Sequence, residues 1–377
     1  MTPRKFPAVF MRGGTSKGIM FHARDLPAAR AEWDEIFLRA MGSPDPGGRQ
    51  LDGMGGGVSS LSKVCVIAPS QREDADVDYT FAQVQIREAR VDYGANCGNM
   101  SSAVGPFALE EGLVRAATGE ATVRIFNTNT RKIIHSTFGV HAGRAAVEGT
   151  LAIPGVAGSG APIRLDFIEP GGATTGRLLP SGKVLDVLDI PGLGRIEVSL
   201  VDAANACVFV AAAALGLTGT EMPEELERDT ATLQKLAAIR LHASVAMGIA
   251  RTLEEARART AVPFVGFVSA AQDARTLSGR SLAADAADLT VRMISNGQPH
   301  RALPLTASLC TAVAARMEGS VVWQASRRGA ASELRLAMPS GVLTVGAEVS
   351  RADASWHAAR GSFYRTARRL FEGCVYA

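Results

Sequence analysis

The sequence has few of the residues that build disulfide frameworks or metal centres. Its 377 residues include only five cysteines, which are widely spaced and form no CxxC pair. We therefore expect neither disulfide bridges nor a zinc site, and reduced thiols favour a cytoplasmic location. The six histidines include no HExxH motif and no pair at the helical spacing of metal ligands, so no metal is expected.

Charge imbalance and long apolar runs are also lacking. The 40 basic residues nearly match the 37 acidic ones, and the net charge is +3. Because like charges form no block, we expect no nucleic-acid partner. The apolar piece near the N-terminus is cut by Pro7 and Arg12, and the sequence contains no run of 18 apolar residues. Neither a signal peptide nor a membrane partner is predicted.

Two glycine-rich stretches, RGGTSKG (12–18) and GMGGGVSSLSK (53–63), do not match the common nucleotide-binding motifs. Neither ends in Gly-Lys-Ser/Thr, and neither is a GxGxxG that enters a helix, so no nucleotide cofactor is expected. The backbone N–H groups of such loops can still hold carboxylates.

Hydrophobic periodicity places the individual elements. In the first part of the chain, the expected strands are 6–13, 64–69, 79–86 and 122–130, and the expected helices are one that opens at Asp25 and one at 100–113. In the second part, the expected strands are 196–203, 207–212, 263–268, 320–323, 333–338 and 342–349, and the expected helices are 223–248 and 302–319.

The order of these elements is similar in two halves of the chain. Glycine and proline are concentrated at residues 154–182, which indicates a boundary. Each half has strands, an amphipathic helix, more strands, and a small-residue helix that follows a polar turn. We predict an α+β chain with halves 1–182 and 183–364, and with residues 365–377 returning to the first half. A ligand would then bind in the cleft between the halves.

Cys97 lies in the turn NCGN (96–99), just before a predicted helix. The N-terminus of a helix has unpaired N–H groups and the positive end of the dipole, and both stabilise a thiolate or a bound carboxylate. Asn96, Gly98 and Asn99 would add amide groups beside such a ligand. The alternative is that Cys97 is a small buried residue, as free cysteines usually are.

Lys63 precedes an apolar strand and follows the serine-containing turn SSLS (59–62). A lysine at the inner end of a buried strand can be desolvated and can then act as a base near neutral pH. An ordinary exposed lysine is the alternative. His300, just before the second small-residue helix, is a further candidate for the site, although a structural histidine would fit the same place.

Several motifs occur together in one order and resemble a single family. These motifs are MRGGTSKG (11–18), GSPD (42–45), LDGMGGG (51–57), SSLSK (59–63), DADVDYTFAQV (74–84), NCGN (96–99), VGPFA (104–108), FNTNT (126–130), LPSG (179–182), TGTE (218–221), MPSG (338–341) and ARRLFEG (367–373). The family is that of the 2-methylaconitate cis-trans isomerases, methylitaconate delta-isomerases and 4-oxalomesaconate tautomerases.

The resemblance implies a diaminopimelate-epimerase-like fold, in which two pseudo-symmetric halves each wrap a sheet around a central helix. Two-base racemases of that fold have a cysteine at the N-terminus of each central helix. Here the first cysteine corresponds to Cys97, whereas Pro304 stands at the second position and Cys310 lies too deep in its helix. The family pairs the cysteine with a lysine, which corresponds to Lys63.

The resemblance also implies an unsaturated polycarboxylate as the substrate and no cofactor. Further substrate-binding residues are expected in both halves. These residues are Ser16, Lys17, Ser59, Ser60, Asn96, Gly98, Asn99, Asn205, His300, Thr306 and Ser340. A homodimer is the assembly to test first. The sequence departs from the family pattern at Leu305, where glycine is usual, and at Met338, where histidine is usual.

The predicted activity is a cofactor-independent 1,3-allylic proton transfer that moves a C=C bond in an acid such as 4-oxalomesaconate or methylitaconate. Cis-trans isomerisation of 2-methylaconitate or aconitate is the alternative within the family. An amino-acid or hydroxy-acid epimerase of the same fold, and a non-catalytic carboxylate-binding protein, are the alternatives outside it.

Overall fold

The computed structural model describes residues 4–93, 97–259, 262–295, 297–327, 333–353 and 355–377. The chain divides into two compact units, of which unit 1 comprises Met1–Asp166 with Tyr364–Ala377 and unit 2 comprises Phe167–Phe363. Whether the predicted halves, 1–182 with 365–377 and 183–364, are the parts in which the chain folds stays a prediction. Among the described residues, no helix is both long enough and apolar enough to cross a membrane.

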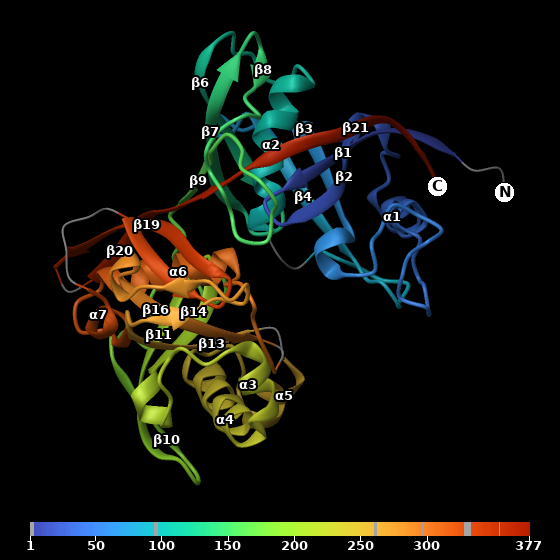
Figure 1. Ribbon diagram of the computed structural model, residues 1–377. Helices are drawn as coiled ribbons and strands as arrows, with labels where there is room; N and C mark the ends of the chain where they lie inside the picture. The colour runs from blue at the N-terminus through green and yellow to red at the C-terminus, as the bar shows by residue number, and fades with distance from the viewer. Residues whose placement is uncertain (1–3, 94–96, 260–261, 296, 328–332, 354) are drawn as a thin grey trace. The chain divides into compact units, whose positions relative to one another are not determined.

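Unit 1 is built from strands that surround one helix (Figure 1). Its strands are β1 (Lys5–Gly13), β2 (Ser16–His22), β3 (Lys63–Pro69), β4 (Val77–Val84), β5 (Val91–Asp92), β6 (Gly119–Asn127), β7 (Lys132–His141), β8 (Arg144–Ala145) and β21 (Ala367–Tyr376), and its helices are α1 (Trp33–Met41) and α2 (Gly98–Glu110). The chain leaves unit 1 within β9 (Ile163–Ile168) and re-enters it at the end of β20 (Ser355–Arg365).

The sheet of unit 1 separates two layers of side chains. Strand β3 pairs in parallel with β2 and antiparallel with β4, while β1 pairs antiparallel with both β2 and β21. Val64 and Val66 of β3 belong to a core cluster with Phe37 of α1. Because side chains alternate along a strand, Lys63 and Cys65 face the opposite side of the sheet. The predicted acid/base lysine is therefore not on the α1 face.

Helix α2 packs closely against its surrounding strands, among them β1, β2, β3, β6, β7, β8 and β21. Eleven of its residues are buried, and most of these are small. Gly105 shows why they are small, because a Cβ atom built on it would lie 2.5 Å from Ser136 Oγ on β7. The sequence therefore forms a central helix that a larger residue at this position would push away from the sheet.

Unit 2 contains the remaining elements. Its strands are β10 (Asp186–Ile190), β11 (Gly194–Ala203), β12 (Asn205–Ala211), β13 (Phe264–Ala270), β14 (Ala274–Arg275), β15 (Ser281–Leu282), β16 (Leu289–Ser295), β17 (Gln298–Pro299), β18 (Glu333–Met338) and β19 (Gly341–Ala352), together with most of β20. Its helices are α3 (Pro223–Arg228), α4 (Thr230–Ala246), α5 (Leu253–Ala258), α6 (Leu305–Arg316) and α7 (Val321–Ala325).

The two units repeat one topology. In unit 1, β1 and β2 form a hairpin, β2 runs parallel to β3, and β4 runs parallel to β6, which then pairs antiparallel with β7. In unit 2, β11 and β12 form the hairpin, β12 runs parallel to β13, and β16 runs parallel to β18, which pairs antiparallel with β19. Helix α6 is buried against β11, β12 and β19 as α2 is buried in unit 1. The predicted pseudo-symmetric α+β architecture is confirmed.

Three predicted elements were wrong. The helix expected to open at Asp25 begins only at Trp33, because Pro27 favours an extended Leu26 before it. Residues 320–323, expected as a strand, begin α7, because Ser320 caps the helix by accepting a hydrogen bond from the Trp323 N–H at 3.0 Å. The single helix expected over 223–248 is two helices, α3 and α4. Asp229 separates them and caps α4 by accepting a hydrogen bond from the Thr232 N–H at 3.0 Å.

Candidate active site

Lys63 is the first residue of β3 and is only 8% exposed. The loop that precedes it is fixed by Gln50, whose Nε2 donates to Ser62 Oγ at 2.7 Å and whose Oε1 accepts from the Gly57 N–H at 3.0 Å. Ser62 Oγ in turn donates to the Val84 carbonyl at 3.1 Å. The serine-rich turn thus leads into a buried lysine at a fixed position in the strand, and the role of Lys63 as a base stays a prediction.

The ammonium group of Lys63 has two described contacts. Its Nζ donates to Gln83 Oε1 at 2.6 Å, and it lies 4.9 Å from the centroid of the Phe81 ring. Both partners are on β4, where Gln83 pairs directly with Lys63 in the antiparallel register. The Lys63 amine is thus held at the start of the strand by a neutral amide and an aromatic face.

Cys97 is the N-cap residue of α2 and is half-buried. Its carbonyl accepts hydrogen bonds from the Ser101 N–H at 2.9 Å and from Ser101 Oγ at 3.0 Å. The first N–H groups of a helix have no partners within the helix, and they make its N-terminus attractive to anions. The expected helix after NCGN is confirmed, and Cys97 lies at its N-terminus.

Cys65 is a thiol whose pKa responds to both predicted acid/base residues, Lys63 and Cys97. It is fully buried, one alternation along β3 from Lys63. Burial raises the pKa of the Cys65 thiol, the nearby Cys97 raises this pKa further, and Lys63 lowers it. Burial also raises the pKa of Tyr79, and both Cys65 and Cys97 add to that effect. Lys63 and Cys97 therefore lie within electrostatic reach of the same buried thiol.

The residues beside Cys97 are arranged around a close approach of β1 to α2. A Cβ atom on Gly13 would lie 2.5 Å from the Asn99 carbonyl oxygen, so only glycine fits there. The side chain of Asn99 is already engaged, because its Oδ1 accepts from the Thr15 N–H at 3.4 Å and its Nδ2 donates to Thr15 Oγ1 at 3.1 Å. Gly98 is buried in the first turn, and Asn96 lies outside the described residues. Binding by Asn99 would thus fall to its backbone.

The other predicted residues of unit 1 do not all share one face. Ser16 is buried at the start of β2, on the face that carries Lys63, whereas Lys17 places its ammonium 5.9 Å from the Phe10 ring on the α1 face. Ser59 is exposed and Ser60 is half-buried in the turn before β3.

The stretch around Ser16, GTSKG (14–18), also matches the GxSxG pattern of hydrolase nucleophiles. In the structure, however, it forms a hairpin rather than a strand that enters a helix, so a nucleophile elbow has no support.

Arg365 is a candidate that the sequence did not single out. It is 7% exposed, its Nε donates to Asn99 Oδ1 at 3.2 Å, and burial lowers its pKa to about 9. A buried guanidinium beside the N-terminus of α2 increases the attraction for a carboxylate there. The arginine lies in the basic segment YRTARR, in which nothing in the sequence distinguishes it from Arg368 or Arg369.

The predicted residues of unit 2 lie at turns and at a helix start. Asn205 begins β12 directly after the hairpin turn, and Thr306 is in the first turn of α6; both are half-buried. Ser340 lies between β18 and β19, and its buried Oγ has no hydrogen-bond partner in the described part of the chain. His300 Nε2 lies 2.6 Å from Ser295 Oγ, and burial lowers the pKa of His300.

Pro304 has the place in unit 2 that Cys97 has in unit 1. It is the N-cap of α6, and its carbonyl accepts from the Ser308 N–H at 2.8 Å and from Ser308 Oγ at 3.0 Å, as Cys97 accepts from Ser101. Cys310 lies deeper in α6, where its thiol contacts the Val201 carbonyl at 3.4 Å. The helix of unit 2 therefore has no thiol at its N-terminus.

Phe264 has the place in unit 2 that Lys63 has in unit 1. Counting from the last pair of each hairpin, Lys63 pairs with Gly18 of β2 and Phe264 pairs with Cys207 of β12. The register of β13 and β16 then puts Ser295 where unit 1 has Gln83. Both acid/base candidates of unit 1 are thus replaced in unit 2 by residues that cannot exchange a proton.

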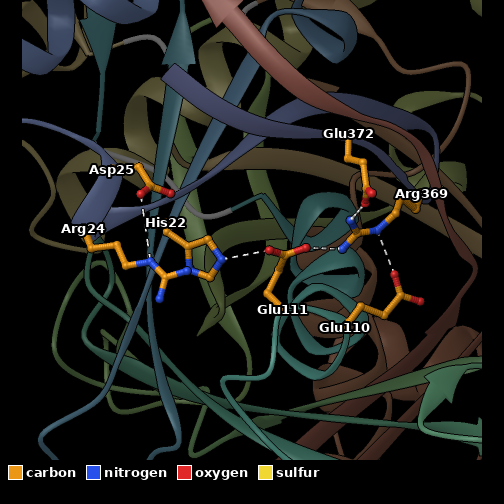
Figure 2. Close-up of polar contacts among 7 residues, drawn as sticks. All are labelled: His22, Arg24, Asp25, Glu110, Glu111, Arg369 and Glu372. Carbon is orange, nitrogen blue, oxygen red and sulfur yellow. Dashed lines mark hydrogen bonds and ion pairs between the residues drawn. The ribbon is translucent and has the colours of Figure 1, made fainter. Parts of the chain in front are cut away.

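A second polar cluster lies at the C-terminal end of α2 (Figure 2). Arg369 binds three carboxylates, with Nε 2.8 Å from Glu110, Nη2 2.6 Å from Glu111 and Nη1 2.5 Å from Glu372. His22 Nε2 lies 3.0 Å from the other oxygen of Glu111. These residues line a cavity of about 550 Å³. Among the described residues, no group of three or more His, Cys, Asp or Glu could hold a metal ion.

Sequence comparison places these features among known proteins. The PrpF protein family matches residues 3–377. The chain is 42% identical to 3-methylitaconate isomerase of Eubacterium barkeri, covering 99% of this chain and 97% of that one. It is 37% identical to 2-methyl-aconitate isomerase of Shewanella oneidensis (98% and 96% covered) and 39% identical to 4-oxalomesaconate tautomerase of Pseudomonas putida (100% and 97% covered).

The fold agrees with these relatives. A crystal structure of methylitaconate-delta-isomerase superposes with a TM-score of 0.91 at 42% identity and covers 100% of this chain and 96% of that one. The resemblance drawn from the short motifs is therefore confirmed over nearly the whole sequence. The chain belongs to the PrpF protein family and is an isomerase.

Proposed function

We propose that the protein moves a C=C bond in a small unsaturated di- or tricarboxylate by a 1,3-proton shift. The observation that carries this proposal is the one-sided placement of its acid/base candidates. Lys63 and Cys97 both lie in unit 1, near Cys65, and Phe264 and Pro304 stand at the corresponding places of unit 2. An epimerase that used two bases would need a proton-exchanging group in both units.

The proposed reaction balances without an electron acceptor. One of the two residues takes a proton from the carbon next to the conjugated system, and the C–H electron pair forms a dienolate that spreads onto a carboxylate or keto oxygen. A proton then returns to the far carbon of the allyl unit, and a new C–H bond forms there as the double bond moves. The N-terminus of α2 and Arg365 would stabilise the negative charge of this intermediate.

Cis-trans isomerisation would follow from the same intermediate. If the dienolate rotates before the proton returns to its original carbon, the double bond is regenerated with the other geometry. The substrate carboxylates would be held by Ser16, Ser59 and Ser60, and the Gly98 and Asn99 amides in unit 1. In unit 2, the proposed carboxylate-binding residues are Asn205, His300, Thr306 and Ser340. The free thiols of all five cysteines support a cytoplasmic location.

Solvent deuterium exchange tests this proposal. The protein is mixed in D₂O with 3-methylitaconate, 2-methylaconitate or 4-oxalomesaconate, and NMR follows the new C–D bonds and the position of the double bond. We expect exchange and isomerisation of at least one acid, and loss of both in Lys63→Met and Cys97→Ser. Arg72→Met, which changes an exposed ion pair, is the matched control. Full activity in both site variants would refute the assignment.

A further inference from the structure

Gln83 makes a set of contacts that fixes which end of its amide faces Lys63. Its Nε2 donates to the Ser62 carbonyl at 2.9 Å and to the Ser59 carbonyl at 3.1 Å. Carbonyl oxygens only accept hydrogen bonds, so the NH₂ end of the amide must point toward them. Its oxygen then faces the Lys63 ammonium at 2.6 Å. A flipped amide would set oxygen against oxygen on one side and NH₂ against ammonium on the other.

The chemistry of this partner suits a lysine that has to gain and lose a proton. Among the described residues, Lys63 forms no ion pair with a carboxylate, and its other contact is the neutral face of Phe81. A carboxylate at 2.6 Å would strongly favour the charged ammonium, whereas a neutral amide oxygen accepts a hydrogen bond from either protonation state of the amine. The site thus directs the lysine without holding its proton.

We propose that Gln83 is a positioning residue that aims the Lys63 amine at the substrate through a neutral acceptor. The proposal rests on the proposed function, because it takes Lys63 to be an acid/base group. It extends that function by relating the turn SSLS (59–62) to the acid/base role of Lys63. The Ser59 and Ser62 carbonyls orient Gln83, and Gln83 orients Lys63. The side chain of Ser59 can face a ligand while its carbonyl holds the amide.

Two substitutions separate positioning from charge. Gln83→Met keeps the approximate volume but removes the acceptor, so the amine loses its fixed direction. We expect kcat to fall by about 10- to 100-fold, with KM changed much less, because small misplacements of a reacting group have effects of this size. Gln83→Glu keeps an acceptor but adds a charge. We expect its kcat to be lowered and its pH profile to move toward alkaline pH, because the added carboxylate favours protonated Lys63.

The matched control is Gln85→Met, since Gln85 follows β4 by one residue and, within the part of the chain that the structure describes, the Lys63 ammonium contacts Gln83 and Phe81 and not Gln85. Steady-state rates are measured with whichever of the three acids is turned over, and circular dichroism confirms folding. If Lys63→Met keeps full activity, Lys63 is not an acid/base group and the positioning role of Gln83 fails with it; if Cys97→Ser also keeps full activity, the proposed function fails. If Lys63→Met is inactive while Gln83→Met keeps both the kcat and the pH profile of the parent protein, only the positioning role of Gln83 is refuted. A Gln83→Glu profile that does not move refutes the neutral-acceptor argument.

Discussion

Replacing Arg369 with methionine removes the cation that binds three carboxylates at the end of α2 (Figure 2). The Glu110 and Glu111 side chains are only 12% and 23% exposed, so their bonds to Arg369 are poorly replaced by water. The Glu372 side chain is 69% exposed and contributes little. Taking about 1.5 kcal/mol for each of the two shielded bonds, we expect the free energy of unfolding to fall by about 3 kcal/mol.

The end of the helix adds to this effect. Glu110 and Glu111 lie at the C-terminal end of α2, where the negative end of the helix dipole disfavours carboxylates by about 0.3 to 1 kcal/mol each. Arg369 and His22 compensate for that placement, and they also join β21 and β2 to the helix. Without the arginine, two shielded carboxylates would remain at the negative end of the helix dipole.

The pH dependence of the free energy of unfolding gives a second test of the role of Arg369. Burial alone would raise the pKa of Glu111, but hydrogen bonds from Arg369 and His22 bring it below its ordinary value of 4.5. A carboxylate with a lowered pKa in the folded state stabilises the protein above its unfolded pKa and stops doing so as the pH falls through the folded pKa. The stability gap between the parent protein and Arg369→Met should therefore be widest near neutral pH and narrow below about pH 4.5.

Urea unfolding followed by circular dichroism at several pH values is the assay. Arg301→Met is the control, since Arg301 also binds two glutamates, at 3.3 Å, but from an exposed position in unit 2. We expect this control to lose less than about 1 kcal/mol. The kcat of folded Arg369→Met should stay within about twofold, because the 13-residue helix puts the cluster about 20 Å from Cys97. A loss equal to that of the control, or a gap that does not change with pH, would refute the reasoning.

Three further substitutions should act through single contacts. Gly13→Ala forces a Cβ atom toward the Asn99 carbonyl, and we expect the free energy of unfolding to fall by about 1 to 3 kcal/mol and kcat to fall as well. Thermal unfolding and steady-state rates measure the two effects, and an unchanged kcat would contradict the close approach. Phe107→Ala opens a cavity in the buried face of α2 and should cost about 3 to 5 kcal/mol in urea unfolding, a value that a loss below 1 kcal/mol would contradict. Asp202→Asn weakens the acceptor of the Thr175 N–H at 2.6 Å, so limited proteolysis should cut residues 171–178 faster than in the parent protein, and an equal cutting rate would contradict this role.

Much of the fold could be predicted from local sequence, because most elements have a clear period and a clear end. The small-residue stretches that became α2 and α6 are examples. Two of the missed elements depended on side-chain capping. Ser320 turned an apolar, strand-like stretch into α7, and Asp229 divided one apparent helix into two. A hydrophobic pattern alone does not show which side chain accepts the first free N–H of a helix.

The candidate site could be predicted where it depends on local sequence and could not where it depends on register. Cys97 and Lys63 stand in recognisable turns, and the structure puts both near Cys65. Gln83 and Arg365 contribute through neighbours that are 20 and 266 residues away in the sequence. Their roles follow from which residue lies opposite which in the sheet, and a single sequence carries no direct sign of that.

The internal duplication explains why one half can lose its bases and the protein can still catalyse isomerisation. Racemisation at one carbon by two bases requires two proton-exchanging groups, which the two-base racemases of this fold take from the two halves of the chain. A 1,3-shift requires only that a proton leave one end of an allyl unit and return to the other end, and groups from a single unit can do both. Under the proposed function, unit 2 therefore needs no acid/base group at the places of Phe264 and Pro304. Differences in substrate between relatives should therefore arise around Thr306 and Ser340 rather than around Lys63.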